Sequence, residues 1–349
     1  MAIIKPSYDI NRKDLRKILP LSGPYTIFIE PTRTCNLKCF FCIHATRGIQ
    51  GGVLERTGVP LSHIDMGMYE KITHDVMEFP ESPKRIVFSG LGEPLMNPRL
   101  GDMARMLREA GYKGRNDIIT NAVLLTPERS AELLDAGITQ FFISVQGMTS
   151  ERYKEICGVA VDMDEYVDNI RWLFEHRKNT KIYIKIIDAN LQHEQEKEQF
   201  YKMFGDICDT IYIEHLIVMQ RQNAEYYIGA VDNSINLNSE VIVKHRKVCS
   251  VMFYLYQVTI EGNVYPCTIP GIPQSLSMGN VKDSSLLEIW NGVKRSDMCR
   301  TNLKEGYRAI PGCVPNQSTS CVCADGILDP NEYLDDCAGE ILERLTNRV

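Results

Sequence analysis

Pro31-Thr32-Arg33-Thr34-Cys35-Asn36-Leu37-Lys38-Cys39-Phe40-Phe41-Cys42 contains three thiols in the spacing C-x3-C-x2-C, and the next cysteine of the chain is Cys157. Such short spacing lets one loop bring its sulfurs to a single inorganic centre. A cubane iron–sulfur cluster normally takes four thiolates, so three would leave one iron without a protein ligand. The alternatives are a structural zinc site, which closes with four ligands, and three cysteines buried only for packing, which the polar residues of the loop disfavour.

At these residues the chain resembles the radical S-adenosylmethionine (radical SAM) superfamily, whose signature is C-x3-C-x2-C with an aromatic residue, here Phe41, before the last cysteine. The resemblance implies that Cys35, Cys39 and Cys42 bind a 4Fe–4S cluster whose open iron chelates the methionine part of S-adenosylmethionine. In the family, an electron from the cluster cleaves the cofactor to a 5′-deoxyadenosyl radical, which abstracts hydrogen from an unreactive C–H bond. An external donor such as flavodoxin or ferredoxin is expected to supply the electron. The cofactors carry this chemistry, and the protein orients them.

Composition limits the class of protein. The 349 residues suffice for one large domain plus a smaller one, and 44% hydrophobic with 24% charged residues is ordinary for a soluble protein. A net charge of −6 disfavours a nucleic-acid partner. We find no signal peptide and no apolar run of membrane-spanning length, so no membrane partner is expected. The twelve cysteines are clustered, which favours metal-bound thiolates in a reducing cytoplasm over a disulfide scaffold.

The pattern from residue 25 to 216 predicts a parallel sheet covered by helices. After a short lead-in (1–24), apolar strand-like segments alternate with amphipathic helical segments, which is typical of βα units. Six such strands are too few for a closed eight-stranded barrel. We therefore expect an open (β/α)6 partial TIM barrel, the usual core of the family, with reactive groups at the C-terminal strand ends. The expected strands are 25–29, 85–89, 117–120, 140–145, 181–187 and 209–214.

The second strand is followed by Gly92-Glu93-Pro94. The family carries Gly-Gly-Glu-Pro here, and its backbone and acid hold the ammonium group of the cofactor's methionine part. Leu91 stands where the first glycine is usual, so only Gly92, Glu93 and Pro94 are assigned to cofactor binding by the resemblance. Alone, this tripeptide would indicate no more than a turn.

Polar residues follow the later strands as well. By the resemblance, Asn121 and Ser144 are expected to bind the cofactor's ribose or carboxylate, with ordinary turn or cap chemistry as the alternative. Lys185 lies among apolar residues, where an unpaired ammonium is costly, so it points either into the barrel toward a carboxylate or out into solvent. We favour the inward orientation and expect Lys185, like Phe41, to contribute to cofactor binding. Glu214 and His215 end the sixth strand, where they suit substrate hydroxyls or acid–base catalysis. A role as local hydrogen-bond partners is the alternative for His215.

Residues 217–349 are expected to form a second domain. Cys249 precedes a predicted strand, Glu261-Gly262-Asn263 indicates a turn, and Cys267 follows the returning strand. Together they form C-x12-G-x4-C, which resembles the SPASM/Twitch auxiliary-cluster extension of radical SAM enzymes. The resemblance implies an auxiliary 4Fe–4S cluster, with a zinc site as the alternative.

The late cysteines depart from the full SPASM pattern, because Asn316 stands where the usual C-x2-C would have its second thiol. We therefore expect one auxiliary cluster, with ligands Cys249, Cys267, Cys313 and either Cys321 or Cys323. The spare cysteine, for which we favour Cys323, is a candidate hydrogen-atom donor to a substrate radical. Other thiols are expected to be buried cysteines on helices, namely Cys157, Cys208 and Cys337.

The leading functional hypothesis is hydrogen abstraction from a small, polar, sugar-like substrate, leading to oxidation or epimerisation. Asp188, Asn190, Glu214 and His215 suit hydroxyl-rich ligands, and the few residues before the first strand leave no room for a leader-peptide-binding domain. The alternatives are a peptide or protein maturase of the thioether or formylglycine type, and a non-enzymatic iron–sulfur electron carrier.

Overall fold

The computed structural model describes residues 1–7, 13–217, 234–242, 246–268, 274–313, 321, 324, 326 and 329–347. Within these ranges the strands form one 10-stranded sheet in the order β1-β7-β6-β5-β4-β3-β2-β8-β9-β10. Their bounds are Ile3–Ile4 (β1), Thr26–Ile29 (β2), Arg85–Phe88 (β3), Arg115–Thr120 (β4), Gln140–Ser144 (β5), Lys181–Ile187 (β6), Thr210–Glu214 (β7), Leu255–Val258 (β8), Asn263–Tyr265 (β9) and Gly279–Asn280 (β10).

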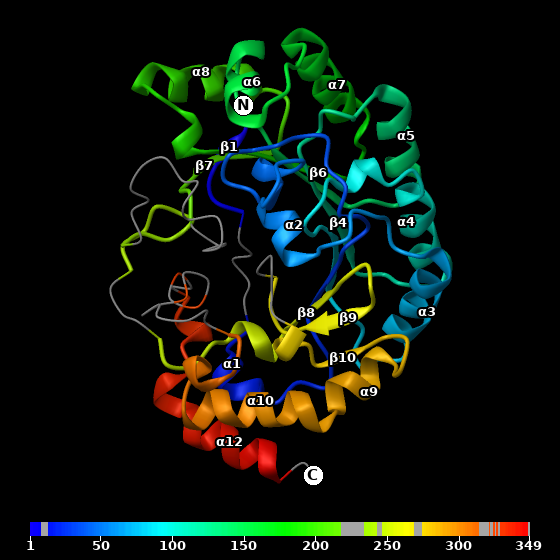
Figure 1. Ribbon diagram of the computed structural model, residues 1–349, viewed down its shortest axis with the longest axis vertical. Helices are drawn as coiled ribbons and strands as arrows, with labels where there is room; N and C mark the ends of the chain where they lie inside the picture. The colour runs from blue at the N-terminus through cyan, green and yellow to red at the C-terminus, as the bar shows by residue number, and fades with distance from the viewer. Residues whose placement is uncertain are drawn as a thin grey trace.

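Strands β2 to β7 are the six predicted strands, and each pairs in parallel with the next. Helices on the connections lie around the outside of this curved sheet (Figure 1). The prediction of an open (β/α)6 partial barrel is therefore confirmed. The helices of this part are Leu15–Ile18 (α1), Val53–Thr57 (α2), Met66–Met77 (α3), Leu100–Glu109 (α4), Pro127–Asp135 (α5), Ser150–Cys157 (α6), Met163–His176 (α7) and Glu194–Phe204 (α8).

Alternation along the strands separates the core from the concave face. In β6, Ile182, Ile184 and Ile186 are buried in the main hydrophobic core, whereas Tyr183 and Lys185 point to the opposite side. Side chains from non-adjacent strands meet on that side: the guanidinium of Arg85 on β3 lies 4.9 Å from the ring centre of Phe142 on β5, with β4 between them. The concave face of the barrel is therefore lined partly by polar residues.

Local sequence signals explain where several helices begin. Thr126 caps α5 by accepting a hydrogen bond from the Arg129 N–H, with Pro127 at the first helical position, as predicted. Ser285 and Glu288 form the predicted capping box of α9 (Leu286–Asn291). Two further helices, α10 (Val293–Lys304) and α12 (Ala338–Thr346), lie with α9 at the base of the molecule in Figure 1.

Both ends of the barrel sheet are extended by segments from elsewhere in the chain. β1 pairs in parallel with β7, so the lead-in contributes a short strand that we did not predict. The predicted hairpin of the auxiliary region is present as β8 and β9, which pair antiparallel. β8 also pairs in parallel with β2, so the hairpin continues the sheet of the barrel. The strand that leads into the cysteine loop is thus directly bonded to the auxiliary region.

Two cysteine placements differ from the prediction. Cys208 is buried but lies in the connection between α8 and β7, and Cys337 ends a short 3-10 turn and is only half-buried. No helix in the described part of the chain combines the length and apolarity needed to span a membrane.

Candidate functional site

The cysteine loop follows β2 and is held by the last turn of α6. The N–H groups of Lys38 and Phe40 donate to the carbonyl oxygens of Cys157 and Ile156, at 2.8 and 3.0 Å. These carbonyls belong to a helix end, where no intrahelical donor is available to them. α6 ends there because Gly158 adopts a left-handed conformation (φ 70°). The loop is therefore fixed by backbone hydrogen bonds to a neighbouring element.

The thiols of this loop are close together and poorly solvated. Burial, together with the nearby Glu93 and the thiols of Cys42 and Cys39, raises the pKa of Cys35 to about 12. Burial also raises the pKa of Cys42 to about 12. Thiolates in such a place need a positive partner, because desolvation disfavours their charge. The donor set therefore fits an iron–sulfur cluster, which supplies that positive charge.

Cys157 lies closer to this site than the sequence indicated. Its sulfur is 3.4 Å from the sulfur of Cys39, although the two residues are 118 positions apart. The contact with Cys157 and burial together raise the pKa of Cys39. The expectation that Cys157 is buried is confirmed, but it packs against a proposed cluster ligand. No sequence signal pointed to this contact, because only the fold brings α6 to the loop.

The turn after β3 packs directly on the cysteine loop. A side chain at Gly92 would place its Cβ 2.5 Å from the carbonyl oxygens of Thr32 and Thr34, so only glycine allows this approach. The N–H of Glu93 donates to the Thr34 carbonyl at 2.9 Å. Pro94 follows and begins the short 3-10 helix Pro94–Met96. The predicted cofactor-binding turn and the predicted cluster loop are therefore in contact.

The carboxylate of Glu93 is buried and accepts several hydrogen bonds within the protein. Its donors are the Thr120 hydroxyl at 2.6 Å, the Asn121 N–H at 2.7 Å and the Leu95 N–H at 3.0 Å. Burial, partly offset by these donors, raises the pKa of Glu93 to about 7. Glu93 thus ties the turn after β3 to the end of β4. Its direct contact with the cofactor stays a prediction.

Asn121 and Ser144 lie at the C-terminal ends of β4 and β5, as predicted. The Asn121 side-chain amide donates to the side-chain oxygen of Asn36, inside the cysteine motif, at 2.8 Å. Ser144 is half-buried, and its carbonyl accepts a hydrogen bond from the Gln146 side chain at 3.0 Å. Phe41 is half-buried and meets the Phe40 ring edge-on. Asn36 is a partner that the sequence interpretation did not identify.

Lys185 points to the concave face of the barrel. This is the inward alternative of the two predicted orientations. Its ammonium lies 2.6 Å from a carboxylate oxygen of the buried Glu214 on the adjacent strand β7. The Tyr183 hydroxyl donates to the other oxygen of Glu214 at 3.1 Å. Next to this cluster, Nδ1 of His215 lies 2.5 Å from a carboxylate oxygen of Asp188. The structure therefore gathers a cation, two acids and an imidazole at the ends of β6 and β7.

The cysteines of the auxiliary region are gathered around Cys249. Burial raises the pKa of Cys249, and the nearby thiols of Cys321 and Cys267 raise it further. Burial likewise raises the pKa of Cys313, which has Cys249 and Cys321 as electrostatic neighbours. The four thiols proposed as auxiliary ligands are therefore near one another, and they fit a second cluster for the same reason as the first set. Cys323 lies outside the described residues.

Asn302 holds Cys249 in place. Its side-chain amide donates to the Cys249 carbonyl at 2.8 Å, and its side-chain oxygen accepts from the Cys249 N–H at 3.0 Å. Cys299, on the same helix α10, is buried in the main hydrophobic core. Cys299 is therefore a packing residue in this structure.

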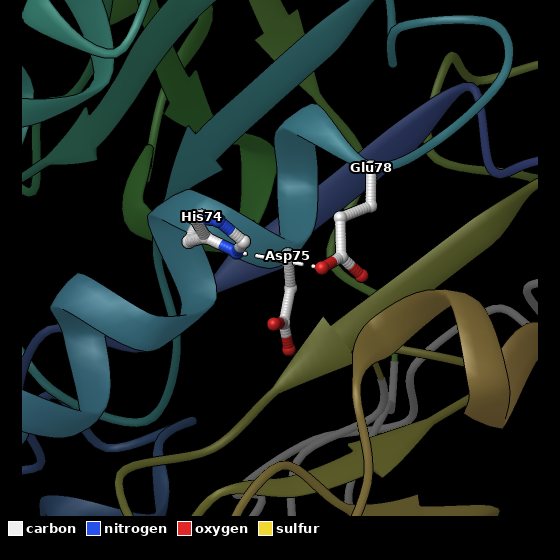
Figure 2. Close-up of side chains that lie close together, drawn as sticks. All are labelled: His74, Asp75 and Glu78. Carbon is white, nitrogen blue, oxygen red and sulfur yellow. Dashed lines mark ion pairs between the residues drawn. The ribbon is translucent and has the colours of Figure 1, made fainter.

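One other set of metal-ligand types lies on α3: His74, Asp75 and Glu78 (Figure 2). Asp75 is buried, and one of its carboxylate oxygens accepts from the Lys71 ammonium at 2.8 Å and from the Leu286 N–H at 3.0 Å. This carboxylate is thus used to pair a lysine and to anchor the first turn of α9. His74 and Glu78 are a helical i,i+4 pair at the surface. Asp75 therefore forms a contact between α3 and the auxiliary region, while His74 and Glu78 form a separate surface pair.

Family models match both halves of the chain. The Radical SAM superfamily model matches residues 29–198, and the SPASM iron–sulfur cluster-binding domain model matches residues 249–321. Together these matches cover more than two thirds of the chain. They include every cysteine proposed above as a cluster ligand, namely Cys35, Cys39, Cys42, Cys249, Cys267, Cys313 and Cys321.

Curated relatives have diverse activities. A tungsten-containing aldehyde ferredoxin oxidoreductase cofactor-modifying protein of Pyrococcus furiosus is 24% identical over 77% of this chain and 81% of its own length. A PqqA peptide cyclase of Rhodopseudomonas palustris is 29% identical over 48% of this chain and 44% of its length. A probable GTP 3′,8-cyclase of Metallosphaera sedula is 30% identical over 61% of this chain and 65% of its length. The chain thus spans less than two thirds of the last two relatives.

The solved structure of anSMEcpe with bound AdoMet is similar over 93% of this chain and 100% of the anSMEcpe chain. The TM-score is 0.59 at 15% sequence identity, which establishes the shared fold. The fold, the cysteine loop and the two family matches agree. The chain belongs to the radical SAM superfamily and carries a SPASM domain, and its cofactors are a 4Fe–4S cluster with S-adenosylmethionine and an auxiliary iron–sulfur cluster.

Proposed function

We propose that this radical SAM enzyme abstracts a hydrogen atom from a small, polar, hydroxyl-bearing substrate and that the substrate is oxidised or epimerised. The observation that carries the proposal is the polar group at the ends of β6 and β7, where Lys185, Glu214 and Tyr183 are joined by hydrogen bonds and Asp188 pairs with His215. These groups present both donors and acceptors on the concave side of the barrel. Such a set recognises hydroxyl and amino groups rather than an apolar surface.

The roles of these residues follow from their geometry. The bound cofactors supply the one-electron chemistry. We propose that the first cluster is bound by Cys35, Cys39 and Cys42. We propose that the auxiliary cluster is bound by Cys249, Cys267, Cys313 and Cys321. Lys185 and Glu214 orient substrate hydroxyls by hydrogen bonds. The carboxylate of Asp188 holds Nδ1 of His215, and we propose that this imidazole takes a proton from a substrate hydroxyl during oxidation. Flavodoxin or ferredoxin is the proposed electron donor.

Relatives with small substrates support this proposal. By their names, the GTP 3′,8-cyclase relative and a dTDP-4-amino-4,6-dideoxy-D-glucose ammonia-lyase of Streptomyces venezuelae, 28% identical over 42% of this chain and 28% of its own length, act on nucleotides or nucleotide sugars. Both names refer to small polar molecules that carry hydroxyl groups on a sugar ring. Peptide or protein maturation, of the thioether or formylglycine type, is the second candidate, because the PqqA peptide cyclase is also a relative. Membership of the radical SAM family favours either enzyme over a simple electron carrier.

Anaerobic turnover decides between the two substrate classes. Reconstituted enzyme with S-adenosylmethionine and a reductant is incubated with a panel of sugars and aminocyclitols and, separately, with peptides that contain cysteine or serine. The proposal expects 5′-deoxyadenosine formation to rise with at least one small hydroxylated compound, and expects this rise to be lost in Lys185→Met and Glu214→Gln. Stimulation by peptides alone would overturn it in favour of the second candidate.

A further inference from the structure

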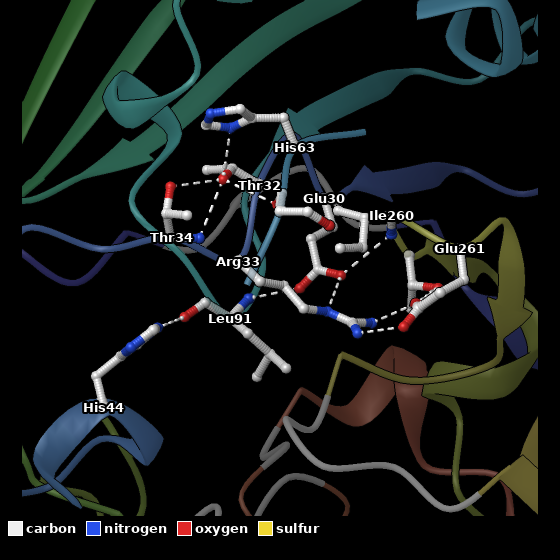
Figure 3. Close-up of polar contacts among 11 residues, drawn as sticks. Glu30, Thr32, Arg33, Thr34, His44, His63, Leu91, Ile260 and Glu261 are labelled. Atoms are coloured by element: carbon white, nitrogen blue, oxygen red, sulfur yellow. Dashed lines mark hydrogen bonds and ion pairs between the residues drawn. The ribbon is translucent and has the colours of Figure 1, made fainter. Parts of the chain in front are cut away.

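A buried carboxylate connects the cysteine loop, the turn after β3 and the auxiliary region. Glu30 follows β2 and is fully buried. One carboxylate oxygen accepts from the Leu91 N–H at 2.8 Å, and the other accepts from Nε of Arg33 at 2.8 Å and from the Ile260 N–H at 3.2 Å. Figure 3 shows these contacts converging on one side chain from three segments of the chain.

Arg33 extends this connection to the hairpin turn of the auxiliary region. Its two terminal nitrogens donate to the two carboxylate oxygens of Glu261, a residue 228 positions away, and the second bond measures 2.6 Å (Figure 3). Such two-pronged pairing of arginine and carboxylate fixes both distance and orientation. Thr259 donates to the same carboxylate at 2.9 Å and holds it in place. The Arg33–Glu261 pair therefore fixes the auxiliary hairpin to the start of the cysteine loop.

The turn after β3 is held from both sides at Leu91. Its N–H is bound by Glu30, and its carbonyl oxygen accepts from Nε2 of His44 at 2.8 Å. At the neighbouring Gly90, an added Cβ would lie 2.5 Å from Cγ of Glu30, so the turn packs directly on this carboxylate. Leu91 is the residue that departs from the family's Gly-Gly-Glu-Pro. The protein thus fixes the backbone of the departing residue by two hydrogen bonds.

We propose that Arg33 and Glu261 are positioning residues through which the auxiliary region holds the turn at residues 90–93 in the geometry that binds the methionine part of S-adenosylmethionine. The pathway runs from Glu261 to Arg33, from Arg33 to Glu30, and from Glu30 to the Leu91 backbone. Loss of the Glu261 pair frees Arg33, weakens its hold on Glu30 and loosens the turn. The inference rests on radical SAM membership and does not depend on which substrate the enzyme uses.

The test compares Glu261→Gln with the wild type in the fully reconstituted enzyme. This substitution keeps the size of the side chain and removes the charge, and the half-exposed position of Glu261 makes it tolerable to the fold. We expect S-adenosylmethionine to bind about tenfold more weakly, within the usual range of coupling between sites, as measured by anaerobic calorimetry. Iron content and the electron paramagnetic resonance spectrum of the reduced, cofactor-free enzyme should match the wild type.

Two more variants separate positioning from a general loosening of the structure. Lys71→Gln breaks the pair with Asp75 and a hydrogen bond to the Ser284 carbonyl at another contact with the auxiliary region. These residues take no part in the pathway from Glu261 to the Leu91 backbone, so cofactor affinity should be unchanged. Glu261→Asp keeps the charge and should recover part of the affinity. Equal affinity in Glu261→Gln and wild type, equal weakening in Lys71→Gln, or loss of iron from Glu261→Gln would each overturn the inference.

Discussion

The ammonium of Lys185 lies 2.6 Å from a carboxylate oxygen of Glu214 on the neighbouring strand, and Glu214 is buried. A lysine in the middle of an apolar strand is thereby paired on the concave face of the barrel. Removing one partner of a buried pair costs more than the pair itself contributes, because the remaining charge has no counterpart.

Lys185→Met should therefore destabilise the enzyme more than the double variant Lys185→Met/Glu214→Gln does. We expect the single substitution to lower the free energy of unfolding by about 3 kcal/mol, because it leaves the Glu214 carboxylate buried without a cation. Chemical unfolding of the reconstituted variants measures both values. If the single and double variants are equally stable, the buried ion pair is not the reason for the placement of Lys185.

Iron analysis should find about eight irons in two cubanes. In Cys35→Ala/Cys39→Ala/Cys42→Ala the proposed auxiliary ligands remain, so about four irons should remain as well. Iron and acid-labile sulfide are measured after anaerobic reconstitution, with Cys299→Ala as the control because Cys299 lies in the hydrophobic core. About eight irons left in the triple variant would mean two auxiliary clusters.

The buried Glu93 should make stability depend on pH. Burial raises its pKa from 4.5 to about 7, so the folded protein binds a proton that the unfolded chain has released between these values. Stability contributed by this group is present below about pH 4.5 and is lost as the pH rises toward 7. Melting of the cofactor-free enzyme should therefore depend less on pH over this window in Glu93→Gln. An unchanged slope would contradict the raised pKa.

The fate of the substrate radical can be read from solvent deuterium. An auxiliary cluster suits electron removal, and a spare thiol suits return of a hydrogen atom. We propose oxidation, so turnover in deuterated water should give a product two hydrogens poorer than the substrate, without deuterium at carbon. Deuterium fixed at carbon in an isomer of the substrate would instead indicate epimerisation, and its loss in Cys323→Ala would identify the donor.

Much of the fold could be predicted because its signals are local. The six apolar segments give β2 to β7, and caps such as Thr126 and Ser285 mark helix starts. β1 was missed because two isoleucines are too short a pattern, and their pairing with β7 is set by tertiary structure. The pairing of β8 with β2 was also missed, because the sequence of a strand does not show which other strand it pairs with.

The candidate site was predictable where its residues form motifs and unpredictable where they meet only in space. The cysteine loop and Gly92-Glu93-Pro94 could be assigned from sequence, and the structure places them in contact. The approach of Cys157 to Cys39 and the pairing of Arg33 with Glu261 join residues more than 100 positions apart. Two charged residues near the cysteine motif, Glu30 and Arg33, indicate that ion pairs form there. The sequence does not show that Glu261 is the distant partner of Arg33.

The most direct test of the account is the formation of 5′-deoxyadenosine from S-adenosylmethionine under anaerobic, reducing conditions, with wild-type enzyme and with Cys35→Ala/Cys39→Ala/Cys42→Ala compared side by side. The account predicts that the wild type forms 5′-deoxyadenosine and that the triple variant forms none while it keeps the auxiliary irons. Full cofactor cleavage by the triple variant would contradict the assignment of the cysteine loop as the reactive centre.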